Sequence, residues 1–257
     1  MSDLVLVQHH GKVVDLALNR AERDNALDLP IVEALLGCLQ DAVQDPGVHV
    51  IVIHGAGTGF CAGLDRALLG EMARGADPAT VLMPVVEVTQ KVISLLATAP
   101  KVTLAATHGY VLGCGLDLAV ACDLRVAAAG TRFASECVHH GLVPEGGATW
   151  SLPRLIGLGP AMAMLLSGDP VDAEGAYRLG LIHRRVALGK HLSDSIRWGE
   201  ELAGSSLAAQ VAVKRLARID PRLSLDAALK EEKEALRRLL LAGEPLRLLD
   251  HASRDAR

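Results

Sequence analysis

The sequence predicts an α/β fold with a mostly helical C-terminal third. Two units each run from strand to glycine-rich loop, helix and strand, and they begin at the apolar runs 48–53 and 101–106. Strands that are apolar without alternation are typical of a sheet buried on both faces. After Pro153 the pattern becomes helical, with Gly-Asp-Pro and Asp-Pro-Arg as breaks. We therefore expect one α/β core followed by helices.

The N-terminal residues predict a hairpin and then a helix. Short β-type runs at 4–7 and 13–18 are separated by His-His-Gly-Lys. Asp28 then precedes Leu29-Pro30, an N-cap followed by proline in the first helical turn. Apolar residues recur at helical spacing from there until Pro46.

The later elements follow from the same rules. A helix is expected over 85–97, a second over 116–121, and a strand over 124–129. No linker interrupts the chain, so we predict one functional unit, with a core over 1–190 and a helical C-terminal region over 191–257. The helical patterns after Pro153 lie at 159–167, 172–180, 193–204, 206–218 and 224–241.

Length and charge limit the classes of function. The chain has 257 residues, enough for a sizeable core, and its 26 basic and 30 acidic side chains give a net charge of −4. Nucleic-acid-binding domains need a clustered basic excess. With only two Trp, two Tyr and two Phe, base-stacking surfaces are not expected either. We expect no nucleic-acid partner.

Cysteines and apolar stretches bear on the compartment. Five cysteines without a Cys-x-x-Cys pair argue against a disulfide framework. The N-terminal apolar run is too short for a signal peptide. The apolar stretches 102–116 and 155–168 are interrupted by Gly, His or Pro and are too short to span a membrane. We expect a cytoplasmic, reduced protein without a membrane partner.

Several common site motifs are missing. Phe60 and Leu118 each stand where a Gly-x-Gly-x-x-Gly loop needs its third glycine. Neither a Gly-Lys-Ser/Thr phosphate loop nor a Gly-x-Ser-x-Gly nucleophile turn occurs. The pair His139-His140 has no partner at metal-ligand spacing. We expect no nucleotide cofactor, no nucleophilic serine turn and no metal site.

Two glycine-rich loops remain as a candidate site. They span 59–65 and 108–117, and each follows a β-type run. Ligands of α/β sheets bind at the carboxyl ends of strands, and small residues leave backbone N–H groups accessible. Two such donors around one substrate oxygen would stabilise negative charge there, and the second loop also leads into a helix N-terminus. The alternative is that both loops are only tight turns.

These loops resemble those of a known family. Phe60-Cys-Ala-Gly-Leu-Asp65 resembles the first oxyanion signature of the crotonase, or enoyl-CoA hydratase/isomerase, superfamily, and the loop that leads through Asp117 resembles the second. Asn19-Arg-Ala-Glu-Arg-Asp-Asn25 is similar to the family's coenzyme A entry segment. Gly141-Leu-Val-Pro-Glu-Gly-Gly147 is similar to the segment after the active-site wall. The motifs occur in the family's order over nearly the whole chain.

The resemblance implies a fold, an assembly and a ligand. The fold is a crotonase-like spiral of ββα units with a helical C-terminal region that forms trimers, often paired into hexamers. The ligand is an acyl-CoA thioester, and no other cofactor is implied. By motif position, the backbone N–H groups of Leu64 and Cys114 polarise its carbonyl. The residues implied in coenzyme A binding are Arg23, which would face the phosphates, Ala26 and Ala62, which would line the channel, and Asp65.

The reaction depends on the carboxylates. The hydratases of this family use two, and the matching positions here hold Asp117 and Cys137. A thiol cannot replace a carboxylate as the water-activating base, and the adjacent Glu136 is expected to point elsewhere. Glu145 stands where some double-bond isomerases of the family carry an acid. One buried glutamate can remove a proton at C2 and return it at C4.

We therefore predict an enoyl-CoA isomerase of fatty acid metabolism with Glu145 and Asp117 as catalytic residues. One alternative is a hydratase-type lyase of altered specificity that uses both carboxylates. Another is a non-catalytic acyl-CoA-binding homologue. Each carboxylate could also serve only to stabilise a helix start.

Two further groups of side chains have open roles. A histidine at 139 or 140 could bind a polar acyl group. The basic residues at 214, 215, 218 and 222 either approach coenzyme A phosphates or form a solvated helix face.

Overall fold

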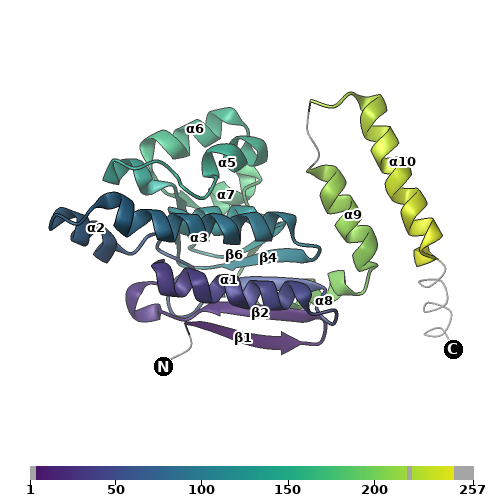
Figure 1. Ribbon diagram of the computed structural model, residues 1–257, viewed down its shortest axis with the longest axis horizontal. Coiled ribbons are helices and arrows are strands. Elements are labelled where there is room, and N and C mark those ends of the chain that lie inside the picture. The colour runs from purple at the N-terminus through teal and green to yellow at the C-terminus, as the bar shows by residue number, and fades with distance from the viewer. Residues whose placement is uncertain (1–3, 219–221, 246–257) are drawn as a thin grey trace.

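The computed structural model describes residues 4–218 and 222–245 (Figure 1). Its strands are β1 Val5–His10, β2 Val13–Leu18, β3 Val50–Gly55, β4 Val102–Thr107, β5 Tyr110–Leu112, β6 Leu124–Ala128, β7 Arg132–Ala134, β8 Val171–Asp172 and β9 Arg184–Val186. The main sheet has the order β1-β2-β3-β4-β6-β9, and a smaller sheet has the order β5-β7-β8. In the main sheet only β1 is antiparallel to its neighbour. The predicted α/β fold is confirmed.

Helices surround this sheet. The short 3₁₀ helices are η1 Ala21–Arg23 and η2 Glu136–His140. The α-helices are α1 Leu29–Gln44, α2 Arg66–Ala73, α3 Pro78–Thr98, α4 Cys114–Ala121, α5 Ala148–Ile156, α6 Leu158–Ser167, α7 Ala173–Leu179, α8 His191–Ala203, α9 Leu207–Ala217 and α10 Leu225–Leu241. Figure 1 shows α1 and α3 lying together across the core, while α9 and α10 stand beside it.

The main sheet is buried on both faces. Every residue of β2, β3 and β4 is buried, as the unbroken apolar runs predicted. One face packs against the helical layer that includes Leu35 of α1 and Leu96 of α3. The other face packs against α8, where Trp198 and Leu202 contact the layer that contains Val52. Burial of both faces supplies most of the apolar contact that stabilises the strands.

The first helix begins as its sequence predicted. Asp28 is the N-cap of α1, and its side chain accepts a hydrogen bond of 3.2 Å from the backbone N–H of Ile31. Pro30 lies in the first turn, where its missing N–H leaves no intrahelical bond unmade. The buried stripe of Ile31, Leu35 and Leu39 then faces the core.

Two expectations about element boundaries were wrong. The helix expected to start at residue 85 starts at Pro78, because Asp77 caps it and Pro84 is accommodated within the first turns. After Pro153 the chain also forms the strands β8 and β9. Both strands are too short for sequence periodicity to reveal, and pairing with β7 and β6 stabilises them.

Helix α3 is long and apolar enough to cross a membrane, by length and composition alone. It has 21 residues, and an 18-residue stretch of it has a mean hydropathy of 1.4 and is 22% buried. Val85, Val92 and Leu96 form a buried stripe, and the helix packs against α1, α2 and α4. One side of α3 therefore contacts the rest of the protein, and the absence of a membrane partner stays a prediction.

Basic side chains of α9 and its C-cap attach this helix to an aspartate and to backbone carbonyls of the core. Asp123 accepts from Lys214 at 2.9 Å and from Arg218 at 2.9 Å, so these basic side chains anchor α9 to the core. Arg215 instead lies 3.8 Å from Glu231 of α10. The predicted C-terminal region runs to residue 257, but residues 219–221 and 246–257 lie outside the described residues. The division at 190/191 stays a prediction, and α8 packs on the core sheet.

The histidine at the start of α8 makes stability depend on pH. His191 stacks on His108 with ring centroids 4.1 Å apart, and burial lowers its pKa to about 4. In the unfolded chain His191 binds a proton near pH 6.5, whereas in the folded protein it binds one only near pH 4. Because the unfolded state binds more protons between these pH values, the free energy of unfolding decreases as the pH falls from about 6.5 to about 4. We expect the free energy of unfolding to fall more steeply from pH 7 to 5 in the wild type than in His191→Phe. Denaturant titrations at several pH values measure the free energy of unfolding. The same dependence on pH in wild type and His191→Phe would contradict the expectation.

Candidate active site

The two glycine-rich loops meet at one edge of the main sheet. Strands β3 and β4 are parallel neighbours, so the loops that follow them leave the same edge. Cys61 and Val111 form an isolated parallel bridge. The Cys61 N–H donates to the Tyr110 carbonyl at 3.2 Å, and the Leu112 N–H donates to the Cys61 carbonyl at 3.0 Å. The predicted juxtaposition of the loops is therefore present.

Glycine is required for this close approach. A Cβ on Gly109, whose φ is +59°, would lie 2.0 Å from the carbonyl oxygen of Thr58. A Cβ on Gly115 would lie 2.5 Å from the carbonyl oxygen of Cys61. No side chain fits at these separations, so the glycines serve loop-to-loop packing as well as turning.

The backbone N–H of Leu64 is directed away from its bridge partner, Leu27. Leu27 donates to the Gly63 carbonyl at 2.7 Å and accepts from the Asp65 N–H at 2.9 Å. In a parallel bridge this pattern directs the intervening Leu64 N–H away from Leu27. A Cβ on Gly63 would lie 3.5 Å from the backbone nitrogen of Cys114, so the two amides belong to one small region.

The backbone N–H of Cys114 has the second predicted position. Cys114 is the first residue of α4, where the N–H groups have no intrahelical acceptor. Within residues 4–218 and 222–245, neither this N–H nor that of Leu64 donates to a protein acceptor. Two adjacent unused donors, one at a helix N-terminus, suit a substrate oxygen that gains negative charge. Their role as an oxyanion hole stays a prediction.

Glu145 reaches the same region from the segment before α5. One carboxylate oxygen, Oε1, contacts the Sγ of Cys114, and the other, Oε2, lies 3.9 Å from the Sγ of Cys137. The backbone carbonyl of Glu145 accepts from the Gln90 side chain of α3 at 2.8 Å. Sequence reasoning missed Gln90, because nothing local distinguishes it from other polar residues on a helix.

Asp117 lies beneath the Glu145 segment. Its side chain is fully buried, and its two oxygens accept from the Gly146 N–H at 3.2 Å and the Ala148 N–H at 2.7 Å. Burial, aided by the nearby Glu145 carboxylate, raises the pKa of Asp117 to about 7. A Cβ on Gly146 would lie 2.5 Å from the Cβ of Asp117, which explains a glycine there. Asp117 thus supports the segment and is not on the pocket wall.

A small cavity of about 40 Å³ opens between these elements. Four of the predicted residues line it: Ala62, Leu64, Cys114 and Glu145. The other lining residues are Gly63, Arg66, Leu69, Gly113, Glu136, Cys137, His140 and Leu142.

The cavity includes Glu136 and separates the two histidines. Glu136 is a lining residue together with Cys137 of the same 3₁₀ helix, η2, and the direction expected for its side chain stays a prediction. His140 also lines the cavity. His139 instead has its Nε2 atom 2.7 Å from the carbonyl oxygen of Ser167, so it connects η2 to α6.

The residues expected to bind coenzyme A have mixed placements. Arg23 is about half exposed, with its Nη1 atom 3.3 Å from Asp65. Asp65 is buried and also contacts Arg20 and the Ala67 N–H. Burial alone would raise its pKa, but the Ala67 N–H and Arg20 together lower it. Asp65 therefore holds Arg23 in place from inside the protein, and Ala26 is buried nearby on the same segment.

Three groups at the site have metal-ligating atoms close together. The ligand atoms of Cys114, Asp117 and Glu145 lie within 4.8 Å of one another. Burial raises the pKa of the Cys114 thiol well above its usual value, and a thiol must lose its proton to bind a metal. Both oxygens of Asp117 already accept backbone hydrogen bonds. A metal ion here would have to displace that proton and those hydrogen bonds.

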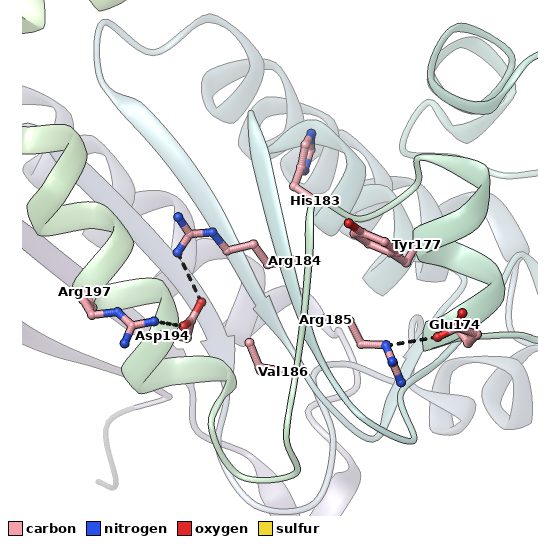
Figure 2. A pocket seen from close by; sticks show the side chains of 8 residues that line it. All are labelled: Glu174, Tyr177, His183, Arg184, Arg185, Val186, Asp194 and Arg197. Atoms are coloured by element: carbon pink, nitrogen blue, oxygen red, sulfur yellow. Dashed lines mark hydrogen bonds and ion pairs between the residues drawn. The ribbon is translucent and has the colours of Figure 1, made fainter.

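A larger cavity of about 570 Å³ lies elsewhere, and Figure 2 shows its side chains. Its arginines are already paired: Arg184 lies 3.4 Å from Asp194, Arg197 contacts the same carboxylate, and Arg185 lies 3.1 Å from Glu174. None of the residues predicted for the site lines this cavity. Its size therefore does not make it the candidate active site.

Comparisons with known proteins point the same way as the loops. The family model described as enoyl-CoA hydratase/isomerase matches residues 8–240. A probable enoyl-CoA hydratase of Mycobacterium bovis is 33% identical over 216 residues, which cover 82% of this chain and 76% of the relative. A 1,2-epoxyphenylacetyl-CoA isomerase of Escherichia coli is 34% identical over 187 residues, which cover 72% of this chain and 71% of the relative.

A solved structure extends the likeness to the fold. The crystal structure of an enoyl-CoA hydratase from Bacillus anthracis matches with a TM-score of 0.90 and 28% identity, covering 98% of this chain and 96% of that one. The resemblance inferred from the sequence motifs and the crotonase-like fold are therefore both confirmed.

Gly63 offers a test of the two backbone donors, which side-chain substitution cannot remove. A Cβ there would lie 2.9 Å from the Leu112 carbonyl oxygen, and the φ of Gly63 is +85°. Gly63→Ala should therefore separate the amides of Leu64 and Cys114 and lower kcat by about 10²- to 10³-fold. Steady-state kinetics measure this. Gly37→Ala is the control, since a Cβ at this α1 position meets nothing within 4 Å; equal kcat values for both variants would contradict the assignment.

Proposed function

The chain belongs to the enoyl-CoA hydratase/isomerase family, and from this premise we propose that it is an enoyl-CoA double-bond isomerase. Its relatives support an enzyme of hydratase or isomerase type, not a protein that only binds acyl-CoA. The observation that carries the finer assignment is the position of Glu145. Its carboxylate shares a pocket with the two backbone donors of Leu64 and Cys114.

The proposed reaction needs one base. Glu145 takes a proton from C2 of a 3-enoyl thioester, and the electrons of that C–H bond move toward the thioester oxygen. The N–H groups of Leu64 and Cys114 stabilise the negative charge on this oxygen. Glu145 then returns the proton at C4 as the double bond moves between C2 and C3. No atom is gained or lost.

Water addition has less support from the residues that would perform it. Asp117 is fully buried, with both oxygens occupied by backbone N–H groups. Burial raises the pKa of the Cys137 thiol to about 12, so this group is not a base near neutral pH. The two-carboxylate arrangement that holds a water is therefore not formed by Asp117 and Cys137.

Hydration stays the second candidate because of one observation. Glu136 lines the pocket together with Glu145, so a second acidic residue belongs to it. The Mycobacterium bovis relative is named a probable hydratase. A lyase of altered specificity would use Glu145 with Glu136, or with Asp117 as the sequence suggested.

The proposal includes a ligand and an assembly. The substrate is an acyl-CoA thioester, with Arg23 directed to its phosphates and the backbone near Ala26 and Ala62 along its channel. The C-terminal helices form a trimer, alone or as a dimer of trimers, and the enzyme works in the cytoplasm without a metal or further cofactor.

Glu145→Gln tests the assignment of the base. The variant keeps the shape of the side chain but cannot accept the proton, so conversion of 3-enoyl-CoA to 2-enoyl-CoA should fall by about 10²- to 10⁴-fold in kcat. Ultraviolet absorbance and mass spectrometry follow the product, which should form without a mass change. Glu136→Gln is the matched control and should keep more than a third of the wild-type rate.

The opposite results are equally clear. An unchanged rate in Glu145→Gln would reject Glu145 as the base. Gain of one water by 2-enoyl-CoA, lost in Glu136→Gln or Asp117→Asn, would establish the hydratase candidate instead.

A further inference from the structure

Two thiols flank the carboxylate of Glu145, one at each oxygen. The Sγ of Cys114 contacts Oε1, and the Sγ of Cys137 lies 3.9 Å from Oε2. The thiols come from different elements, α4 and η2, so their convergence is a tertiary feature. Both side chains are buried.

Both thiols keep their protons near neutral pH. Burial raises the pKa of Cys114 well above its usual value, and the Glu145 and Asp117 carboxylates raise it further. The same causes raise the pKa of Cys137 to about 12. Each group is therefore a neutral S–H that can donate a hydrogen bond to a carboxylate.

Within the described chain the carboxylate of Glu145 has no stronger partner. No Lys, Arg or His of residues 4–218 and 222–245 lies within ion-pair distance of it, although Arg66 and His140 line the same cavity. Asp117 and Glu136 add negative charge nearby. A partly buried carboxylate without donors is costly, so the two thiols are the groups that stabilise and orient it.

We propose that Cys114 and Cys137 are positioning residues whose S–H groups hold the Glu145 carboxylate in the orientation required for proton transfer. This inference rests on the proposed function, since it assigns the supports of its base. It assigns a role to Cys137, which stands at the position where the hydratases of the family have their second carboxylate. A neutral donor orients Glu145 without the repulsion that another negative group would add.

Cys114→Ala tests the proposal, because it removes the thiol and keeps the backbone N–H. We expect kcat for 3-enoyl-CoA to fall by about tenfold with little change in KM, since a hydrogen bond to a charged group is lost. Cys114→Ser, which restores an O–H donor, should recover most of the rate. Cys137→Ala should lower kcat less than Cys114→Ala does, and Cys137→Ser should recover most of that loss.

Cys122→Ala is the matched control. Cys122 is a buried thiol at the C-cap of the same helix, but its Sγ donates to the Leu118 carbonyl at 3.5 Å and it is not a lining residue. The control should keep the wild-type kcat and KM. If Cys114→Ala matches this control, or if Cys114→Ser is as impaired as Cys114→Ala, the thiol only fills space and the proposal is overturned.

A spectroscopic readout separates this proposal from the proposed function. The S–H stretching band of Cys114, identified as the infrared band lost in Cys114→Ala, should move to higher frequency in Glu145→Ala, because the acceptor is gone. This result is independent of turnover. A band that does not move rejects the thiol contact even if Glu145 is the base. A shifted band with a fully active Glu145→Gln rejects Glu145 as the base, and with it the positioning role, and leaves only the thiol contact.

Discussion

The buried carboxylate of Asp117 connects the two halves of the site. It belongs to α4, whose first residue presents one of the two backbone donors, and it accepts from the N–H groups of Gly146 and Ala148. Glu145 is adjacent to the first of these amides, so its position is set relative to the donor of Cys114. Removing either partner would leave a buried polar group unsatisfied, at a cost of about 1–3 kcal/mol. This constraint holds the Glu145 segment in a fixed position relative to the backbone N–H groups of Leu64 and Cys114.

The two buried aspartates near the candidate site differ in their pKa values. Burial and the Glu145 carboxylate raise the pKa of Asp117 to about 7, so much of its charge is neutralised near neutral pH. The pKa of Asp65 is shifted in the opposite direction. Burial alone would raise it, but the Ala67 N–H and Arg20 together lower it. Asp117 thus supports the Glu145 segment without full charge, whereas Asp65 stays ionised and holds Arg20 and Arg23.

Local sequence rules predicted the parts of the fold that local interactions form. The Asp28 cap of α1, the buried strands β3 and β4, and the two glycine-rich loops all follow from residue type and spacing. Motif order singled out Glu145, Leu64 and Cys114 as candidates, and the structure brings all three to one cavity. The features that the sequence did not predict depend on contacts between distant segments. Gln90 donates to the Glu145 carbonyl, Glu136 lines the cavity, and α8 packs on the main sheet. Such contacts have no signature in the segment that makes them.

Transfer of a labelled proton tests the single-base mechanism most directly. A 3-enoyl-CoA that carries deuterium at C2 is converted in ordinary water, and the 2-enoyl product is analysed early in the reaction for the position of the label. If Glu145 both removes and returns the proton, part of the deuterium appears at C4 and the product gains no water. Solvent hydrogen alone at C4 from the first turnovers, or 3-hydroxyacyl-CoA as the main product, would contradict it.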